Sequence, residues 1–246
     1  MAEIILINDQ DQEQIVGGVN ELVCRSPTGN VSFSGVADSV TDSIIMHSIA
    51  GKYVNNRVQS IGGSTFAYCA NLTEVEFDNV IEVGSASFLE CTGLKKISFP
   101  KATTFGSSCF YNCGSLENLD LPNLSRANEK FALNCQKLVS VNLPLCSSIG
   151  ASAFGRCFGM SRFDFSAVTY IGPSAFGACG YLTSFVLRTP SVCRLVHSSA
   201  FEGTPIQTST TTGFIYVPDE LVDSYKAANN WKTFESKIKP LSELEE

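Results

Sequence analysis

Cysteine could carry the most chemistry in this 246-residue chain, and six of its ten cysteines recur every 22 residues. They are Cys69, Cys91, Cys113, Cys135, Cys157 and Cys179. A thiolate can act as a nucleophile or bind zinc. Structural zinc, however, needs ligands that converge tetrahedrally, usually with a CxxC pair, whereas cysteines spaced one per repeat form a line. The spacing therefore predicts no metal site.

Disulfides are possible by distance alone. If each 22-residue unit stacks on the next, successive cysteines lie ~4.8 Å apart, which is within disulfide range. Stacked side chains point the same way, however, and a chain of 246 residues is long enough to fold without covalent staples. Because free cysteine is among the most buried residue types, we predict free thiols in a packing column.

Catalysis would have to rest on very few residues. The chain has two histidines, His47 and His197, and neither lies in a recognisable nucleophile or metal motif. A pair formed by Cys193 and His197 is the remaining route to an enzyme, but no orienting residue or oxyanion element accompanies it. We therefore predict a non-catalytic protein that needs no cofactor.

The cysteines are one column of a longer repeated pattern. Apolar residues stand three, six and eight positions after each cysteine, as Leu94, Ile97 and Phe99 do after Cys91. A strict period in this range is typical of a solenoid. Only the end of each unit, here Ile97-x-Phe99, alternates as a strand does, so we expect one short strand per turn and parallel stacking of the strands.

Two further columns are expected to shape each turn. Phenylalanines should form an aromatic wall opposite the strands, and glycines should occupy a corner where φ is positive or backbones approach closely. The phenylalanines are Phe66, Phe88, Phe110, Phe154, Phe176 and Phe201, and the glycines are Gly62, Gly84, Gly106, Gly150 and Gly172.

The fourth unit departs from this pattern. Ala127-Asn128 replaces the usual Ile-Gly, and Phe131-Ala132 reverses the usual order of a small residue and phenylalanine. Asparagine can replace glycine at positive φ. We expect a local bend or bulge in this turn.

The period divides the chain into three segments. Residues 1–57 lack it and are predicted to be an N-terminal cap, with short strands at Ile4 to Ile7, Val31 to Phe33 and Ile44 to Met46. Residues 58–217 form the solenoid of about seven turns. Residues 218–246 form a C-terminal helical cap and tail. Asp219 is expected to cap the helix, and an apolar edge of Trp231, Phe234 and Ile238 to close the rod.

Composition argues against several kinds of partner. The formal net charge is -7, and no run of basic residues is longer than the pair Lys95-Lys96. Nucleic acid and anionic membranes both need a positive footprint, so neither is an expected partner. The first residues lack the features of a signal peptide, and no apolar stretch of about 18 residues could span a bilayer.

The unit Ile171-Gly172-x-x-Ala175-Phe176-x-x-Cys179-x-x-Leu182-x-x-Phe185-x-Leu187 resembles the leucine-rich repeat of the BspA type. Residues Phe214 to Pro218 and Tyr225 to Trp231 are similar to the C-terminal cap that this family often has. The resemblance covers about residues 58 to 240 and implies an α+β, β-rich solenoid, a right-handed leucine-rich-repeat array. It also implies a recognition scaffold of the kind found on bacterial cell surfaces, in adhesins and in phage or prophage tails.

The expected location follows from that resemblance and from the N-terminus. Without an export signal or wall anchor, the family's role fits a virion or prophage particle, or a cytoplasmic protein. The cell surface would require an export signal that lies outside this sequence.

In each strand, the residues that flank the inward apolar ones should face outward and line one face of the sheet. The candidate ligand-binding residues on this face are Glu74, Glu76, Lys96, Asn118, Asp120, Asn142, Arg162, Asp164, Phe214 and Tyr216; Ser98, Ser140, Ser184 and Val186 share it. Phe214 and Tyr216 are the better anchors, because aromatic residues dominate interface hot spots. A merely solvated sheet face would show the same mixture of charges.

Three functions remain open at this point. The first is a recognition and adhesion module whose partner is a protein or a glycan. The alternative is a passive structural component of a phage tail or cell surface. The last is an enzyme that depends on Cys193 and His197.

Overall fold

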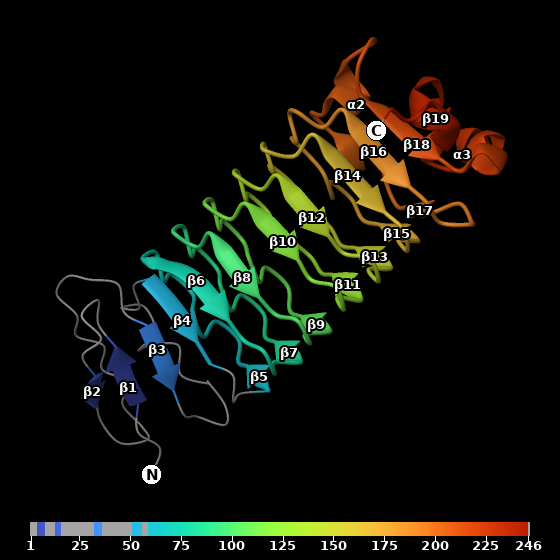
Figure 1. The fold of residues 1–246 in the computed structure, drawn as a ribbon. Helices are drawn as coiled ribbons and strands as arrows, with labels where there is room; N and C mark the ends of the chain where they lie inside the picture. The colour runs from blue at the N-terminus through green and yellow to red at the C-terminus, as the bar shows by residue number, and fades with distance from the viewer. Residues whose placement is uncertain (1–3, 8–12, 16–31, 36–50, 56–58, 246) are drawn as a thin grey trace.

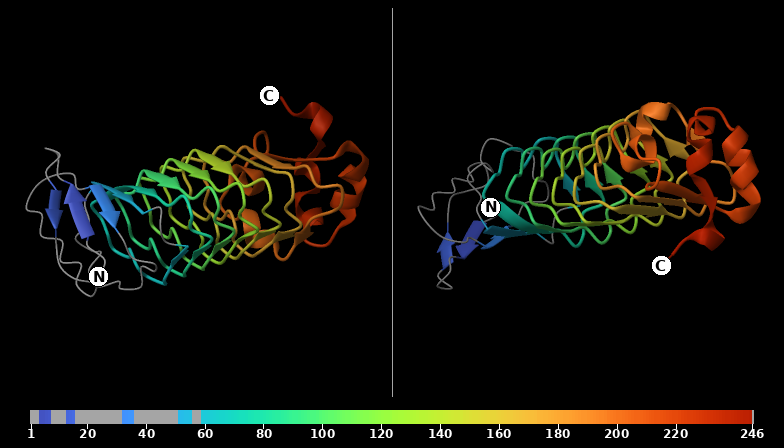
Figure 2. Two further views of the ribbon diagram at one scale, coloured as in Figure 1. Left: turned by 60° about the horizontal axis from the view of Figure 1, so that its bottom comes forward. Right: turned by 90° about the horizontal axis from the view of Figure 1, so that it is seen from above.

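A computed structural model describes residues 4–7, 13–15, 32–35, 51–55 and 59–245. The chain winds into an elongated rod, with the first strands at one end and the short helices at the other (Figures 1 and 2). Residues 22 positions apart pair in register on neighbouring parallel strands, as Glu74 does with Lys96. The expected solenoid is therefore confirmed.

One side of the rod is a row of parallel strands, which we name the main row (Figure 1). It consists of β4 (Gly51–Val54), β6 (Leu72–Glu76), β8 (Lys96–Ser98), β10 (Asn118–Asp120), β12 (Ser140–Asn142), β14 (Arg162–Phe165), β16 (Ser184–Leu187), β18 (Phe214–Val217) and β19 (Ile238–Pro240). The 22-residue register reaches back to β4, earlier than the expected start near Val58. At the other end, β14, β16, β18 and β19 form one continuously paired sheet.

A second row of two-residue parallel strands runs along the rod, so the prediction of one strand per turn was wrong. The row consists of β5 (Ser60–Ile61), β7 (Glu82–Val83), β9 (Thr104–Phe105), β11 (Arg126–Ala127), β13 (Ser148–Ile149), β15 (Tyr170–Ile171) and β17 (Arg194–Leu195). In each of these strands the second residue is buried, as Val83 and Phe105 are. The strands place one more apolar residue per turn in the core.

The glycine column lies where two backbones approach closely, which is one of the two expected alternatives. A Cβ atom built on Gly106 would lie 2.3 Å from the backbone nitrogen of Ser85 in the preceding turn. Positive φ falls instead on two columns of other residues. These are Ser64, Ala86, Ser108, Lys130, Ser152 and Ser174, and then Tyr68, Glu90, Asn112, Asn134, Arg156 and Ala178.

The phenylalanine column is fully buried and stacks along the rod. The rings of Phe66 and Phe88 are 5.1 Å apart and nearly parallel, and those of Phe88 and Phe110 are 5.5 Å apart. Fully burying each such ring stabilises the fold by ~2 to 3 kcal/mol. The aromatic wall is therefore confirmed as core.

The fourth turn keeps the core filled despite its reversed order. Phe131 and Ala132 are both fully buried, and the ring of Phe131 lies edge-on to that of Phe110, with centroids 5.5 Å apart. Asn128 does not have positive φ, contrary to expectation. Its side-chain Nδ2 donates to the carbonyl of Phe105 at 2.7 Å. We expected a bend or bulge in this turn. The structure instead shows that the second row is interrupted, because β9 and β11 belong to separate sheets.

The N-terminal strands extend the main row beyond β4. β3 (Ser32–Gly35) pairs with β4 in parallel, β1 (Ile4–Ile7) pairs with β3 antiparallel, and β2 (Glu13–Ile15) pairs with β1. The strand expected at Ile4 to Ile7 is confirmed, and β3 overlaps the one expected at Val31 to Phe33. The strand expected at Ile44 to Met46 lies outside the described residues.

The C-terminal segment folds into short helical pieces. They are η1 (Ser198–Phe201), α2 (Pro205–Thr208), η2 (Asp219–Leu221), α3 (Val222–Ala227), η3 (Trp231–Lys237) and η4 (Leu241–Glu243). The indole of Trp231 donates to the carbonyl of Cys193 at 2.6 Å, which ties this segment to the last turn.

One detail of this segment differs from expectation. Asp219 does not cap its own helix, because its carboxylate accepts the backbone N–H of Ser242 at 3.1 Å. Hydrogen bonds from the Ser242 side chain and then from its backbone lower the pKa of Asp219. Trp231, Phe234 and Ile238 are buried as the expected apolar edge, and Ile238 lies in the strand β19, where it pairs with Ile215.

Candidate functional site

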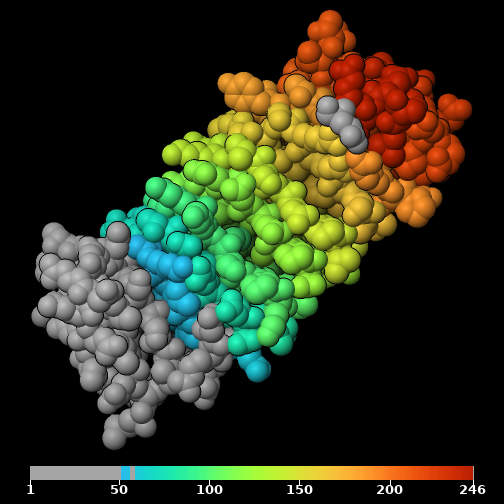
Figure 3. Space-filling model, viewed as in Figure 1, coloured from blue at the N-terminus to red at the C-terminus, as the bar shows by residue number. Residues whose placement is uncertain are grey.

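The outward side chains of the main row form two columns along the rod. The first column is Lys52, Glu74, Lys96, Asn118, Ser140, Arg162, Ser184 and Phe214, and the second is Val54, Glu76, Ser98, Asp120, Asn142, Asp164, Val186, Tyr216 and Lys239. No helix of the described chain crosses this outward face, because the helices gather at the C-terminal end (Figure 1). The space-filling view shows the successive turns following one another along the rod (Figure 3). All ten predicted site residues share this outward face.

At its N-terminal end, the outward face carries an acidic cluster held by one lysine. The ammonium of Lys52 lies 3.5 Å from Glu74 and also makes a hydrogen bond to Glu76. The hydrogen bond to Glu76 outweighs desolvation and raises the pKa of Lys52. Sequence reasoning missed Lys52, because the residues around it do not show the repeat.

In the middle, the outward face is polar and exposed. The side-chain amide of Asn142 donates to the carboxylate of Asp120 at 2.8 Å, across neighbouring strands. Lys96 and Asn118 are exposed. Lys96, Asn118, Asp120 and Asn142 thus lie near one another in the two columns. Lys96 and Asn118 are on β8 and β10, which belong to separate sheets.

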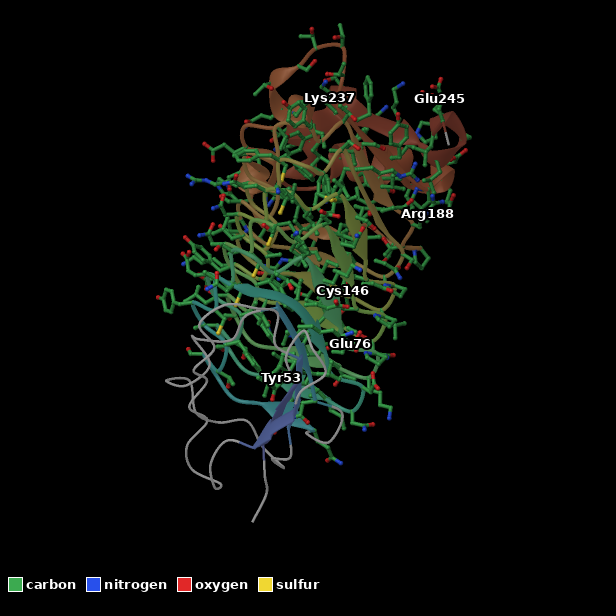
Figure 4. The ribbon with its side chains drawn as sticks, turned by 60° about the vertical axis from the view of Figure 1, so that its left-hand side comes forward. Tyr53, Glu76, Cys146, Arg188, Lys237 and Glu245 are labelled. Carbon is green, nitrogen blue, oxygen red and sulfur yellow. The ribbon has the colours of Figure 1, made fainter. Side chains whose placement is uncertain are left out.

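Towards the C-terminal end, two arginines share one carboxylate. Asp164 accepts from Arg162 at 2.6 Å and from Arg188 at 2.8 and 2.9 Å. Burial raises the pKa of Asp164, but the hydrogen bonds from Arg188 and Arg162 outweigh it and leave that pKa below its usual value. Arg188 was missed, because it follows the last residue of β16. Figure 4 shows Arg188 and Glu76 on the same side of the rod.

The aromatic end of the outward face is flanked by lysines. The rings of Phe214 and Tyr216 lie 6.5 Å apart. The ammonium of Lys239 lies 4.3 Å from the centroid of the Phe214 ring, and that of Lys237 lies 5.2 Å from it. Lys237 also donates to the carbonyl of Thr212 at 2.7 Å, and burial lowers its pKa. Both predicted anchors are half-buried, and Phe214 lies beside two cations.

Two outward residues between these groups are unusual. Val186 faces outward in register with Asp164 and Tyr216, yet it is fully buried. The hydroxyl oxygen of Ser184 is buried and has no hydrogen-bond partner among the described residues. Val186 was predicted to be exposed on the face, and the structure corrects that prediction.

The cysteine column lies inside the rod, and its sulfur atoms form a row (Figure 4). The nine described cysteines are buried thiols that form no disulfide among themselves, as predicted; Cys24 lies outside the described residues. The thiol of Cys113 donates to the carbonyl of Phe88 at 3.1 Å, and that of Cys135 to Phe110 at 3.1 Å. Burial raises the pKa of Cys113 well above its usual value and that of Cys135 to about 12. These thiols are packed hydrogen-bond donors.

Cys193 and His197 each have a backbone hydrogen-bond partner. Burial raises the pKa of the Cys193 thiol to about 12, which disfavours the thiolate. His197 Nδ1 accepts the backbone N–H of Ser199 at 3.0 Å and so caps η1. Cys193 also lines a cavity of about 280 Å³ beside Asn230 and Trp231.

Across the described part of the chain, no group of three or more His, Cys, Asp or Glu side chains could hold a metal ion. Among the same residues, no helix is both long and apolar enough to cross a bilayer.

The stacked 22-residue turns, the parallel main row and the filled core define a leucine-rich-repeat solenoid. The BspA type leucine-rich repeat region matches this sequence in six copies, over residues 59–183 and 103–220. The chain belongs to that family. None of the curated proteins matches its sequence.

Solved structures share the fold. A leucine-rich cell surface protein from Faecalibacterium prausnitzii A2-165 has 22% identity and a TM-score of 0.58 over 78% of this chain and 55% of its own. A leucine-rich repeat protein from Bacteroides ovatus ATCC 8483 has 21% identity and a TM-score of 0.56 over 82% of this chain and 57% of its own. The chain thus spans a little over half the length of these two structures.

Proposed function

We propose that this protein is a recognition and adhesion module that binds a protein or glycan through the outward face. The observation that carries the proposal is that ion pairs hold several charged side chains of the outward face in place. Lys52 holds Glu74 and Glu76, and Asp164 is held by Arg162 and Arg188. Side chains that are already ordered lose less conformational entropy when a partner binds.

The place of action is part of the same proposal. The neighbour from Faecalibacterium prausnitzii is described as a cell surface protein. That description supports the cell surface as the location of this chain, ahead of a virion or the cytoplasm. An adhesion role there requires partners on another cell or in the surrounding matrix.

Binding to immobilised cell-wall fractions, extracellular-matrix proteins and glycans tests the proposal. The labelled chain is compared with Arg162→Glu and Tyr216→Ala. Both changes alter exposed or half-buried positions on the outward face, so we expect weaker binding with an unchanged melting temperature.

Matched controls come from other sides of the rod. Arg156→Glu makes the same charge reversal at an exposed site with positive φ, and Glu90 already occupies an equivalent position with φ of 59°. Tyr181→Ala removes a tyrosine that is 70% exposed and off the outward face. If the controls weaken binding as much as the test variants, the outward face is not the site. If none of the probes binds, the passive structural alternative gains support.

A further inference from the structure

The C-terminal end of the outward face forms a surface that we name the cationic patch: Arg162, Arg188, Phe214, Tyr216 and Lys239. These residues lie on β14, β18 and β19 or directly follow β16, and the four strands are one paired sheet. The register fixes their order along the rod. Asp164 pairs with Val186, Val186 with Tyr216, and Tyr216 with Lys239.

The cationic patch is positive on a chain whose formal net charge is -7. Arg162 and Arg188 share the single carboxylate of Asp164. Lys239 lies 3.1 Å from Glu243, and Lys237 adds a further charge beside Phe214. At the opposite end of the face the balance is reversed, because Lys52 meets two glutamates. The electrostatic potential of the outward face therefore favours binding of an anionic partner at the C-terminal end.

The floor between the two cationic ends is aromatic. Tyr216 and Phe214 are half-buried, and their ring centroids lie 6.5 Å apart. Val186, the neighbour of Tyr216 in the second column, is fully buried and lies beneath the surface. An apolar side chain laid on this floor would cover Tyr216.

The spacing of the cationic ends matches an extended peptide. The rows of Asp164 and Lys239 are three strand intervals apart, which is about 14 Å at ~4.8 Å per interval. An extended chain advances ~3.3 Å per residue, so four residues cover about 13 Å and residues i, i+2 and i+4 face the same way. Acidic side chains at positions i and i+4 of the peptide would reach the two cationic ends, and an apolar side chain at position i+2 would lie on the floor.

We propose that the cationic patch binds an extended acidic segment of a partner protein with the pattern acidic-x-apolar-x-acidic. One carboxylate pairs with Arg162 and Arg188, the apolar side chain covers Tyr216, and the second carboxylate pairs with Lys239. This inference rests on the proposed function and names the class of partner. A sugar ring fits less well, because the ammonium of Lys239 stands 4.3 Å over the Phe214 ring on which the sugar would stack.

Synthetic ten-residue peptides test the pattern against the full chain, by fluorescence anisotropy at low ionic strength. One peptide contains Glu-Thr-Val-Thr-Glu, a second has both glutamates replaced by glutamine, and a third has the same composition with the two glutamates adjacent. We expect the first to bind best, and each of the other two to be at least about fivefold weaker. Added salt should weaken the binding of the first.

Variants of the chain locate the contact. Arg162→Glu and Lys239→Glu should each weaken the first peptide by about fivefold or more, while Arg156→Glu should leave it unchanged. Equal binding of the rearranged or the glutamine peptide would overturn the proposal. A uronic-acid oligosaccharide that binds more tightly, with the same dependence on Arg162, would replace the peptide by a glycan. If no acidic peptide binds but a partner from the immobilised probes still requires Arg162, this inference is wrong and the proposed function stands.

Discussion

The inward and outward sides of the main row differ in how much they vary. Three positions after each cysteine, the inward residues are Leu72, Leu94, Leu116, Leu138, Met160 and Leu182, all buried. Two positions further on, the outward residues are Glu74, Lys96, Asn118, Ser140, Arg162 and Ser184. An inward side chain must fill a close-packed space, whereas an outward one need only be compatible with water. The inward columns therefore specify the fold, and the outward face carries what is particular to this chain.

The largest expected effect comes from opening the aromatic wall. Phe110→Ala removes a fully buried ring that packs on Phe88, Phe105 and Phe131. It should lower the free energy of unfolding by about 3 to 5 kcal/mol, measured by chemical denaturation. Asn118→Ala, an exposed outward change, should stay within about 0.5 kcal/mol. A melting shift under about 2 °C for Phe110→Ala would show that the column is not core.

The next effect tests the close approach of backbones at the glycine column. Gly106→Ala would place its Cβ 2.3 Å from the nitrogen and 2.4 Å from the Cα of Ser85, so one turn must shift. We expect a loss of about 1 to 3 kcal/mol. Gly114→Ala is the matched control, because a Cβ there meets no atom within 4 Å. Equal effects in both variants would contradict the packing explanation.

A smaller effect is expected from the cysteine column. Cys113→Ala removes the thiol bond to the Phe88 carbonyl and a few packing contacts, and should cost about 1 to 2 kcal/mol. In the folded wild type the buried thiols should react slowly with a thiol reagent near neutral pH, and burial also raises the pKa values of Cys113, Cys135 and Cys157. In denaturant all ten should react, and a count far below ten would indicate disulfides.

The sequence period predicts the inward columns because each is a repeated packing requirement. Phe66 and Cys91 could be placed in the core from spacing alone. The second row was missed because its strands have only two residues, which is too short for alternation to be visible. The thiol bonds to carbonyls of the preceding turn were also missed. They depend on how each turn is shaped, including the positive φ at Glu90 just before Cys91.

The candidate site could be predicted only as a set of outward positions. Glu74 and Asp164 were placed on the correct face, because strand alternation determines which way a side chain points. Their partners Lys52 and Arg188 were not predicted. Long side chains reach neighbours that the strand pattern does not specify, and Arg188 reaches Asp164 from beyond the end of its own strand.

The smallest expected effect is on the outward face, at the carboxylate of Asp164. Asp164→Asn should lower the free energy of unfolding by less than about 1 kcal/mol, because the ion pairs with Arg162 and Arg188 are solvent-exposed. The pKa of Asp164 is lowered in the folded state, so the stabilisation is present above the unfolded pKa of about 4 and is lost as the pH falls through the folded pKa. Denaturation of both proteins at about pH 7 and about pH 2 should show the difference shrinking in acid.

Salt separates this outward effect from an inward one. At about 0.5 M salt, exposed ion pairs are weakened, so the difference between wild type and Asp164→Asn should shrink. The loss caused by Phe110→Ala should remain, because a buried ring is not stabilised by charge. A difference for Asp164→Asn that shrinks neither in salt nor in acid would mean that Asp164 stabilises the fold by packing. The division between inward columns that hold the fold and an outward face that is free to vary would then fail at this residue.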